Sequence, residues 1–503
     1  MLELGRQLGA SFSKLEGLFN GVPPLDYSLV PQPYRGWLMQ RPDVLRGNYA
    51  YNPERQTDRS PQREITANQA YFEWMGKQFP EYGELIERVI QNPVSLTREG
   101  GVAGAKMIGR RSLSPMECKC RVAVVIPAKD EEKSVYQTLE SYSQQQTVDG
   151  KPLDSHLYEL DILVNTREGE EFDGTYDEIM RFKRDNPNIH VNALEIKFDE
   201  SWAKVGMARK LMSDIALARS LQRNVFYRTP LYLQADDADL VWVDPQQIRT
   251  VIDTFDQQPH LDTLTGYQEK FLRYISNIEF IFLSRRFWDL MTTQANHYLH
   301  QGRIPPKNRD FHWSRPFTYG TNTAITAEAY ALIGGYDWDS AVGEDLDLGK
   351  RVSLLRGREI NGVFTPELAT IGTSRTRSNS SPRRYLWSLI KETGNPYSEG
   401  NFQNGEVRKL SMDDMARAVP PQYLKLTEDS KRNYEKELWF LYESTRRIIP
   451  DKALAKLITK RSLVFMGFCP EDVEVTDNEV YILNVNNFSR AMEDYRQRKG
   501  IKI

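Results

Sequence analysis

The chain has 503 residues, of which 40% are hydrophobic and 27% are charged, and its formal net charge at pH 7 is -3. This balance excludes a disordered or fibrous chain, and it argues against a general affinity for nucleic acid or for anionic membranes. The length predicts about two to four domains. Because no apolar stretch reaches the about 18 residues that span a bilayer and no secretory signal opens the chain, we expect a soluble, cytoplasmic protein.

We expect residues 1–115 to form an accessory, mainly helical region. A helical pattern over residues 67–90 places large apolar side chains among charges, at Tyr71, Phe72, Trp74, Met75 and Leu85. This aromatic content favours packing on the next domain over independent disorder. Residues 98–115 are rich in glycine and are typical of a linker or loop.

The three cysteines, Cys118, Cys120 and Cys469, are too few and too irregularly spaced for a disulfide framework, so we expect free thiols. No second cysteine pair accompanies Cys118 and Cys120, which argues against a zinc site there. His297 and His300 have the spacing of one helix face. Because no neighbouring acidic residue completes a ligand set, a surface or packing pair explains them better than metal binding.

An alternation of strands and helices begins at residue 121. A continuous apolar run over residues 121–126 ends in the polar loop Pro127-Ala128-Lys129-Asp130-Glu131 and is followed by a helical stretch over residues 135–146. This pattern is typical of a buried parallel strand whose carboxyl end faces a ligand crevice. The alternation continues with strands near 160–164 and 190–194 and with helices that begin near residues 176 and 202. It predicts an α/β fold with a doubly wound, mostly parallel sheet.

Residues 231–245, LYLQADDADLVWVDP, combine an apolar strand with an acidic turn. We expect the strand to end before Asp236, Asp237 and Asp239, and a helix to begin near Pro245. Two carboxylates two residues apart can converge on one hard cation, such as Mn²⁺ or Mg²⁺. Taken alone, the turn is explained better as a solvated acidic loop.

The second half of the chain carries less specific signals. Residues 373–384 are polar and basic, and they suit either a mobile lid whose arginines clamp a diphosphate or a solvated connecting loop. The aromatic-rich stretch 271–293 predicts a core or acceptor-side helix, with a peripheral membrane surface as the alternative. Residues 401–503 predict an α-rich region for acceptor capture or oligomerisation, with helices over 434–448 and 452–466 and a short hairpin over 473–485.

Five motifs follow one another along the chain. They are the first strand and loop Val124–Glu131, the basic helix start Lys204–Arg209, Asp237-Ala-Asp239 with the trailing Pro245, the turn Gly334-Gly335-Tyr336-Asp337, and Gly343-Glu344-Asp345-Leu-Asp347-Leu348. In this order they resemble family 2 of the nucleotide-sugar glycosyltransferases, which have the GT-A fold. The resemblance covers about residues 120–385 and rests on the order of the motifs as much as on any one of them.

The resemblance implies a metal-dependent, hexosyltransferase-type enzyme. It would move a sugar, with inversion, from a nucleotide diphosphate-sugar donor to a hydroxyl group of a carbohydrate, lipid-linked or small-molecule acceptor. It also implies a Rossmann-like GT-A domain over residues 116–400, between the accessory regions 1–115 and 401–503. The residues implied at the nucleotide-sugar site are Pro127, Ala128, Asp130, Glu131, Asn165, Lys204, Arg209, Asp237, Arg375 and Arg377.

The resemblance implies Asp239 as a metal ligand and places Asp237 beside it, toward the ribose or the donor sugar. Asp236 would be the ligand if the register of the motif were shifted. A divalent cation there would stabilise the leaving diphosphate as a Lewis acid. Asp345 is the candidate general base, with Glu344 second. A helix start with acidic first-turn residues explains this last pair without catalysis.

Several of these residues also suit purely structural roles. Asp130 and Glu131 suit the N-terminal charges of the next helix, and Lys204 and Arg209 suit exposed helix charges. Asn165 stands where the family usually has an acidic residue that reads the nucleobase. A sugar nucleotidyltransferase is one alternative class, although the loop after the first strand has no glycine. A non-catalytic sugar-nucleotide binding protein is the other, and the intact aspartates argue against it.

Overall fold

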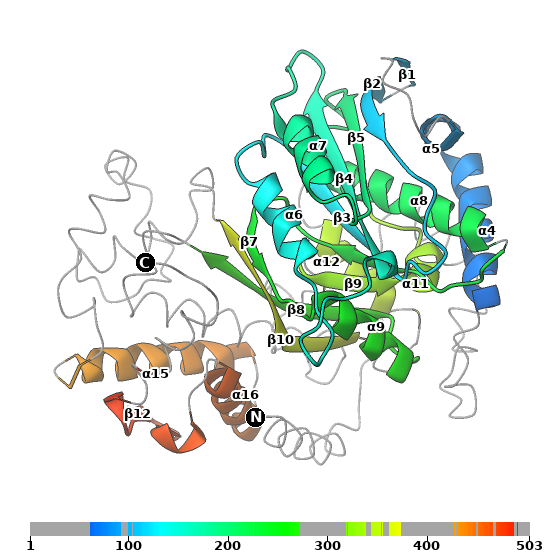
Figure 1. Ribbon diagram of the computed structural model, residues 1–503. Helices are drawn as coiled ribbons and strands as arrows, with labels where there is room; N and C mark the ends of the chain where they lie inside the picture. Colours follow the sequence, from blue (N-terminus) through cyan, green and yellow to red (C-terminus); the bar gives the residue numbers. More distant parts are fainter. Residues whose placement is uncertain are drawn as a thin grey trace.

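The computed structural model describes residues 61–91, 99–271, 318–373 and 427–490, with short gaps inside the last three stretches. Within these residues, a 10-stranded sheet has the order β1-β2-β5-β4-β3-β6-β9-β8-β10-β7, and β11 pairs with β12 in a sheet of their own (Figure 1). The strands are β1 Glu99–Val102, β2 Ala105–Ser112, β3 Val122–Ala128, β4 Tyr158–Arg167, β5 Val191–Phe198, β6 Tyr232–Ala235, β7 Leu240–Val243, β8 Thr263–Phe271, β9 Thr323–Thr326, β10 Gly362–Thr373, β11 Val473–Val475 and β12 Val480–Ile482.

The α-helices follow the strands in the alternating order that the sequence predicts. Among the described residues, two helices precede the sheet, several connect its strands, and two follow it toward the end of the chain. They are α4 Pro61–Gln78, α5 Pro80–Gln91, α6 Val135–Ser143, α7 Thr175–Asp185, α8 Val205–Asn224, α9 Gln247–Gln257, α11 Ala327–Leu332, α12 Glu344–Ser353, α15 Lys431–Ile448 and α16 Lys452–Phe465.

The centre of the sheet is parallel. Strands β5, β4, β3 and β6 run side by side in one direction, and β8 and β10 form a second parallel pair beyond the antiparallel β9. Strands β2, β7 and β9 oppose the others. The central β3 is buried along nearly its whole length, which explains its continuous apolar sequence. The predicted α/β fold with a mostly parallel sheet is confirmed.

Helices cover both faces of the sheet (Figure 1). Helices α6, α7 and α9 share one apolar core with the sheet, whereas α8, α11 and α12 share the other. Helices α4 and α5 lie outside α8, so that α8 is enclosed between them and the sheet. This enclosure explains why most side chains of α8 are buried, including several charged ones.

The expected packing of the N-terminal helical region is confirmed for its described part. Tyr71, Trp74 and Met75 belong to the same apolar core as α8. The hydroxyl groups of Tyr71 and Tyr82 also donate hydrogen bonds to the buried carboxylate of Asp214 on α8, at 2.9 and 2.8 Å. The expected continuous helix is two helices, because α4 ends just before Phe79 and α5 begins at Pro80, where a proline is tolerated.

Several strands were not expected from the sequence. The predicted linker over residues 98–115 contains β1 and β2, which extend the sheet, and β2 pairs with β5. At the β1–β2 turn, Gly104 has a φ of +81° and lies against the Trp202 ring, where a Cβ would come within 2.0 Å of the ring. The acidic turn after β6 also does not lead directly into a helix, because the short strand β7 precedes α9.

The described part of the C-terminal region agrees with the sequence. Helices α15 and α16 and the antiparallel β11–β12 pair lie where they are expected. The stretches 272–293 and 374–384, with Arg375 and Arg377, and the pair His297 and His300 lie outside the described residues. None of the helices in the described part of the chain is long and apolar enough to cross a membrane.

Candidate functional site

The sheet changes its winding direction between β3 and β6. From β3 the chain proceeds to β4 and then to β5 on one side, whereas β6 pairs with β3 on the other side. The loop after β3 and the acidic turn after β6 lie close together here, because Thr138 on α6 donates a hydrogen bond to the backbone carbonyl of Ala238 at 2.8 Å. In open α/β sheets such a switch point opens a crevice in which ligands bind. The loop at residues 129–134 and the turn at residues 236–239 stand at this point.

Asp236 anchors the acidic turn from inside the protein. It is fully buried, and its oxygens accept hydrogen bonds from the Asn322 amide at 2.9 Å, from the Gln234 side chain at 3.0 Å and from the Tyr142 hydroxyl. Burial raises the pKa of this carboxyl to about 7, although the hydrogen bonds oppose the shift. With its oxygens directed to internal donors, Asp236 fixes the position of Asp237 and Asp239 rather than facing the crevice.

Arg209 joins two of the sequence motifs. Its Nη2 atom lies 2.7 Å from Asp237 Oδ1, and its Nη1 atom pairs with a carboxylate oxygen of Glu344. Burial disfavours the charge of this guanidinium, but the two carboxylates outweigh burial and raise its pKa. The α8 start, the β6–β7 turn and the α12 start are thus held together by one side chain.

A short segment before β9 completes this arrangement. The Thr321 hydroxyl donates to Asp237 Oδ2 at 2.5 Å, so both oxygens of Asp237 are oriented. Gly320 leaves room for the guanidinium, because a Cβ there would lie 2.4 Å from Arg209 Nη1. Sequence reasoning missed this segment. Its available signal was Gly320 with Asn322, two residue types that favour turns, directly before a strand; Asn322 has a φ of 56°.

Glu344 and Asp345 differ in their surroundings. The Glu344 side chain is buried in its ion pair with Arg209, whereas Asp345 is half-buried at the first turn of α12. The Thr318 hydroxyl donates to the backbone carbonyl of Asp345. Carboxylates in the first turn of a helix are stabilised in their ionised form by the helix dipole.

The glycine pair lies against this helix. The Arg351 side chain on α12 pairs with Asp347 at 2.6 Å and donates to the backbone carbonyls of Ile333 and Gly335 at 2.7 and 2.6 Å. Gly334 and Gly335 both have positive φ, of 86° and 72°. The structure therefore brings the glycine turn and the Glu-Asp motif together, as their order in the sequence indicates.

The loop after β3 is tied to the loop after β4. Lys129 Nζ lies 2.7 Å from the carboxylate of Glu170, and this contact, with the Arg167 amide and the Thr166 hydroxyl, lowers the pKa of Glu170 to about 2. Pro127 and Ala128 end β3, and the buried Asn165 lies near the end of β4.

Two of the residues expected at the nucleotide have other contacts or conformations. The Glu131 carboxylate accepts a hydrogen bond from Ser134 at the start of α6, which fits its alternative role at a helix N-terminus. Asp130 has a φ of 57°, a conformation that aspartate tolerates better than most residues. Lys204 directly precedes α8, half-buried. Of the expected site residues, Arg375 and Arg377 lie outside the described residues.

Comparisons with known proteins give no family assignment. No protein-family model matches the chain, and no curated protein matches it. Among solved structures, it is similar to a mannosyltransferase, PcManGT from Pyrobaculum calidifontis, in complex with GDP-Man and Mn²⁺, with 14% identity over 82% of this chain and 88% of that chain and a TM-score of 0.34. It is also similar to TarS from S. aureus, with 11% identity over 75% and 92% of the two chains and a TM-score of 0.32.

A third similar structure is glucosyl-3-phosphoglycerate synthase from Mycobacterium tuberculosis in complex with Mn²⁺, uridine diphosphate and phosphoglyceric acid. The identity is 14% over 56% of this chain and 80% of that chain, with a TM-score of 0.27. At such identities and TM-scores, function has to be inferred from the side chains of this chain.

Proposed function

We propose that this chain is a metal-dependent glycosyltransferase that moves a sugar from a nucleoside diphosphate-sugar donor to a hydroxyl group of an acceptor, with inversion. One observation carries the proposal. Arg209 contacts Asp237, 28 residues along the chain, and Glu344, 135 residues along the chain, at the switch point of the sheet. The acidic turn suited to a donor diphosphate and the helix start suited to an acceptor therefore lie on the two sides of one guanidinium.

The acidic turn has the chemistry of a site for a hard divalent cation. Asp237 and Asp239 are only partly buried, and the Asp237 side chain is 35% exposed. Carboxylate oxygens are the donors that Mn²⁺ and Mg²⁺ prefer. We assign Asp239 and Asp237 as the residues that hold the cation, and Asp236 as their buried support. The cation would supply Lewis-acid stabilisation of the departing diphosphate.

The side chains around the turn orient the donor. Arg209 and Thr321 fix the Asp237 carboxylate from two sides, and each carboxylate oxygen keeps a second lone pair that a cation can use. Lys204 stands at the N-terminal end of α8, where backbone amides and the helix dipole favour a phosphate. Pro127, Ala128, Asp130 and Glu131 follow β3 and would line the nucleotide, with Asn165 nearby at the end of β4.

Asp345 is assigned as the general base. Glu344 is committed to the buried ion pair with Arg209, so taking up a proton there would disrupt that pair. Asp345, its half-buried neighbour, can accept the proton of the acceptor hydroxyl as that oxygen attacks the anomeric carbon. Arg375 and Arg377, which lie outside the described residues, are proposed to bind the diphosphate by charge-assisted hydrogen bonds.

The test is release of nucleoside diphosphate from a panel of UDP- and GDP-sugars, measured with and without Mn²⁺ and candidate acceptors. The proposal expects metal-dependent release that an acceptor accelerates. Asp345→Asn should lower turnover by about 10² or more and leave donor binding nearly unchanged. The matched control is Asp149→Asn, on an exposed loop, which should keep full turnover.

Two outcomes would contradict parts of this proposal. If Glu344→Gln is folded and binds the donor but is inactive, while Asp345→Asn is active, the base is Glu344. If donors bind but no condition releases diphosphate, the chain is a binding protein and the enzymatic assignment is wrong.

A further inference from the structure

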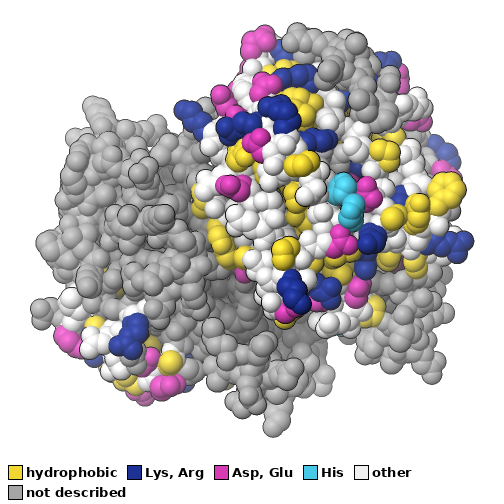
Figure 2. Space-filling model, viewed as in Figure 1, with side chains coloured by type: hydrophobic (Ala, Val, Ile, Leu, Met, Phe, Trp, Pro, Cys, Tyr) yellow, Lys and Arg dark blue, Asp and Glu magenta, His cyan; other side chains and the backbone are white. Residues whose placement is uncertain are grey.

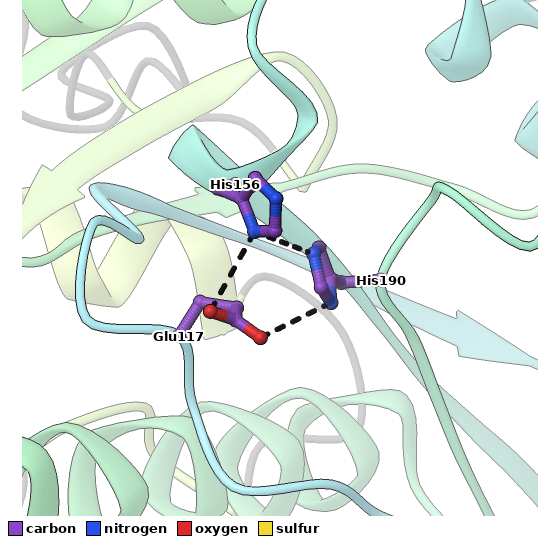
Figure 3. A group of neighbouring side chains, drawn as sticks. All are labelled: Glu117, His156 and His190. Atoms are coloured by element: carbon purple, nitrogen blue, oxygen red, sulfur yellow. Dashed lines mark hydrogen bonds and ion pairs between the residues drawn. The ribbon is translucent and has the colours of Figure 1, made fainter.

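A second group of side chains that can bind a metal lies at the amino ends of the parallel strands, opposite the acidic turn. Glu117 precedes β3, His156 lies in the short 3-10 helix Ser155–Leu157 that leads into β4, and His190 directly precedes β5. Their side chains converge (Figure 3). Because β3, β4 and β5 are parallel neighbours, these residues stand at the amino ends of the strands, away from the carboxyl-end crevice.

The spacing of the ligand atoms suits a small tetrahedral ion. His190 Nε2 lies 3.2 Å from His156 Nδ1, and Glu117 Oε2 lies 3.5 Å from the same Nδ1. Zinc–ligand distances of about 2.0–2.1 Å place tetrahedral ligand atoms about 3.3 Å apart. The second nitrogen of His190, Nδ1, lies 3.9 Å from Glu117 Oε1, and one ligand atom from each of the three residues lies within 4.8 Å of the other two.

The backbone around each ligand is fixed. The Glu117 carbonyl accepts from the Cys120 amide at 3.1 Å, and the His190 carbonyl accepts from the Leu160 amide at 2.8 Å. The His156 amide donates to the Asp154 side chain at 3.1 Å. These contacts limit how far the three side chains can separate, which favours a preformed site.

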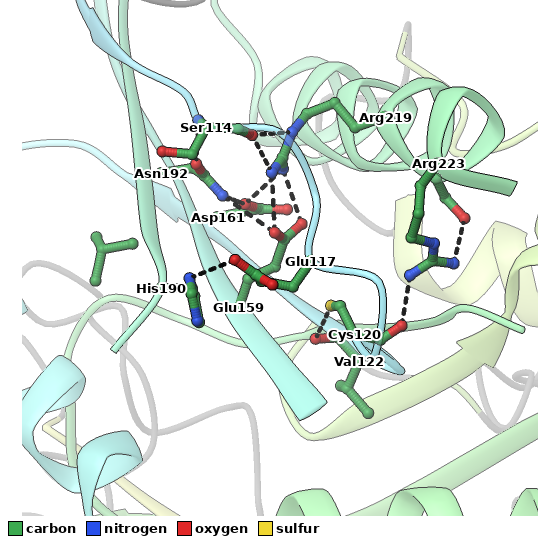
Figure 4. A network of polar contacts seen from close by, with 12 residues as sticks. Ser114, Glu117, Cys120, Val122, Glu159, Asp161, His190, Asn192, Arg219 and Arg223 are labelled. Atoms are coloured by element: carbon green, nitrogen blue, oxygen red, sulfur yellow. Dashed lines mark hydrogen bonds and ion pairs between the residues drawn. The ribbon is translucent and has the colours of Figure 1, made fainter. Parts of the chain in front are cut away.

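A buried polar network holds the segment that carries Glu117 (Figure 4). Ser114 donates its amide to Asn192 at 2.9 Å, and its carbonyl accepts from Arg219 at 2.6 Å. Arg219 also forms two hydrogen bonds with the Glu159 carboxylate, at 2.8 and 2.9 Å. The segment is therefore anchored to α8, β4 and β5 just before it reaches Glu117.

The ligand set is open to solvent on one side. The side chains of Glu117, His156 and His190 are 40%, 51% and 28% exposed, and acidic and histidine side chains are accessible on the face drawn in Figure 2. In the described part of the chain, the ion-pair partners found for Glu117 are these two histidines. An ion could therefore enter without unfolding, and water could fill a fourth position.

We propose that Glu117, His156 and His190 bind one Zn²⁺ ion that joins the amino ends of β3, β4 and β5. Two imidazole nitrogens and one carboxylate oxygen are a donor set that zinc accepts, whereas the all-oxygen turn at Asp237 and Asp239 suits Mn²⁺ or Mg²⁺. The two sites differ in donor chemistry and lie at opposite ends of the parallel strands. The zinc site does not depend on the proposed transferase activity.

The test is calorimetric titration of the full chain, freed of metal with a chelator, with zinc sulfate. One ion should bind per chain, and Glu117→Gln, His156→Asn and His190→Asn should each weaken binding by about tenfold or more. Cobalt titration gives a second readout, because visible absorption bands of bound Co²⁺ should appear in the wild type and be lost in the same variants. Unchanged circular dichroism shows that each variant is folded.

The controls separate this site from other zinc ligands. His260→Asn and Cys118→Ser should keep zinc binding, and Asp239→Ala should keep it as well, whatever its effect on donor binding. Absence of zinc binding by the wild type, or equal binding by all three ligand variants, would overturn the proposal. Loss of binding in Cys118→Ser alone would also overturn it, because a thiol would then be the ligand.

Discussion

Replacement of Arg209 by methionine tests the contact that joins the site. Methionine keeps much of the side-chain volume and removes the charge, which leaves Glu344 as a carboxylate without its cation. The side chains of Arg209 and Glu344 are 6% and 3% exposed, so solvent screens this pair weakly. Breaking a buried pair by removing one partner costs about 3–5 kcal/mol. The Asp237 side chain is 35% exposed, so loss of its contact with Arg209 adds at most about 1 kcal/mol to this cost.

Urea unfolding followed by circular dichroism measures this cost. Arg209→Met should lower the free energy of unfolding by about 3–5 kcal/mol, a large share of the about 5–15 kcal/mol of a typical domain. Adding Glu344→Gln to Arg209→Met should recover part of the loss, because it removes the unpaired charge. The matched control is Arg249→Met, which breaks a more exposed pair with Asp253 on α9 and should cost less than about 1 kcal/mol. A cost below about 1 kcal/mol for Arg209→Met, or no recovery in the double variant, would refute the buried bridge.

Three further predictions concern the scaffold, and urea unfolding measures each of them. Burial raises the pKa of Asp236 from 3.8 to about 7, so the stability that this group contributes is complete below about pH 4 and is lost as the pH rises through about 7. Asp236→Asn should therefore lose less stability than the wild type between about pH 5 and about pH 8, and parallel pH profiles would contradict the shift. Tyr71→Phe removes one hydroxyl donor from the buried Asp214 carboxylate and should cost about 1.5–3 kcal/mol, whereas a cost below about 0.5 kcal/mol would show that this contact is dispensable. Gly335→Ala and Gly150→Ala both place a Cβ on a residue with positive φ, but only the Cβ at Gly335 would meet other atoms, at 2.8 Å from two tyrosine hydroxyls. Gly335→Ala should therefore lower the free energy of unfolding by at least about 1 kcal/mol more than Gly150→Ala. Equal costs would argue against that crowding.

The sequence allowed the central layer of the fold to be predicted, because its strands carry continuous apolar runs. Strand β3 is buried along nearly its whole length, and its composition therefore identifies it without any partner. Strand β1 is Glu-Gly-Gly-Val, which has no apolar alternation and is indistinguishable from a loop in the sequence. Its place in the sheet depends on the β1–β2 turn at Gly104 and on the pairing of β2 with β5, which are non-local.

Some residues of the candidate site could likewise be predicted from the sequence, whereas others depend on non-local contacts. The Asp237 and Glu344 motifs could be selected from their residue types and order, but Arg209 was equally consistent with an exposed helix charge. Its burial depends on Asp237, Gly320 and Glu344, which come from distant parts of the chain, so no local pattern reveals it. Thr321 contacts Asp237 across 84 residues and Tyr142 contacts Asp236 across 94 residues, so neither contact has a signal in the local sequence.

The central claim is that the acidic turn holds a donor diphosphate through a divalent cation, and calorimetric titration with UDP and GDP tests it most directly. In chelator, the diphosphate meets the carboxylates of the turn as like charges, so binding should be weak. With Mn²⁺, binding of at least one of the two nucleotides should strengthen by about tenfold or more, and Asp239→Ala should abolish that gain while the exposed-loop variant Asp149→Asn keeps it. Equal affinity with and without Mn²⁺ in the wild type would contradict the claim.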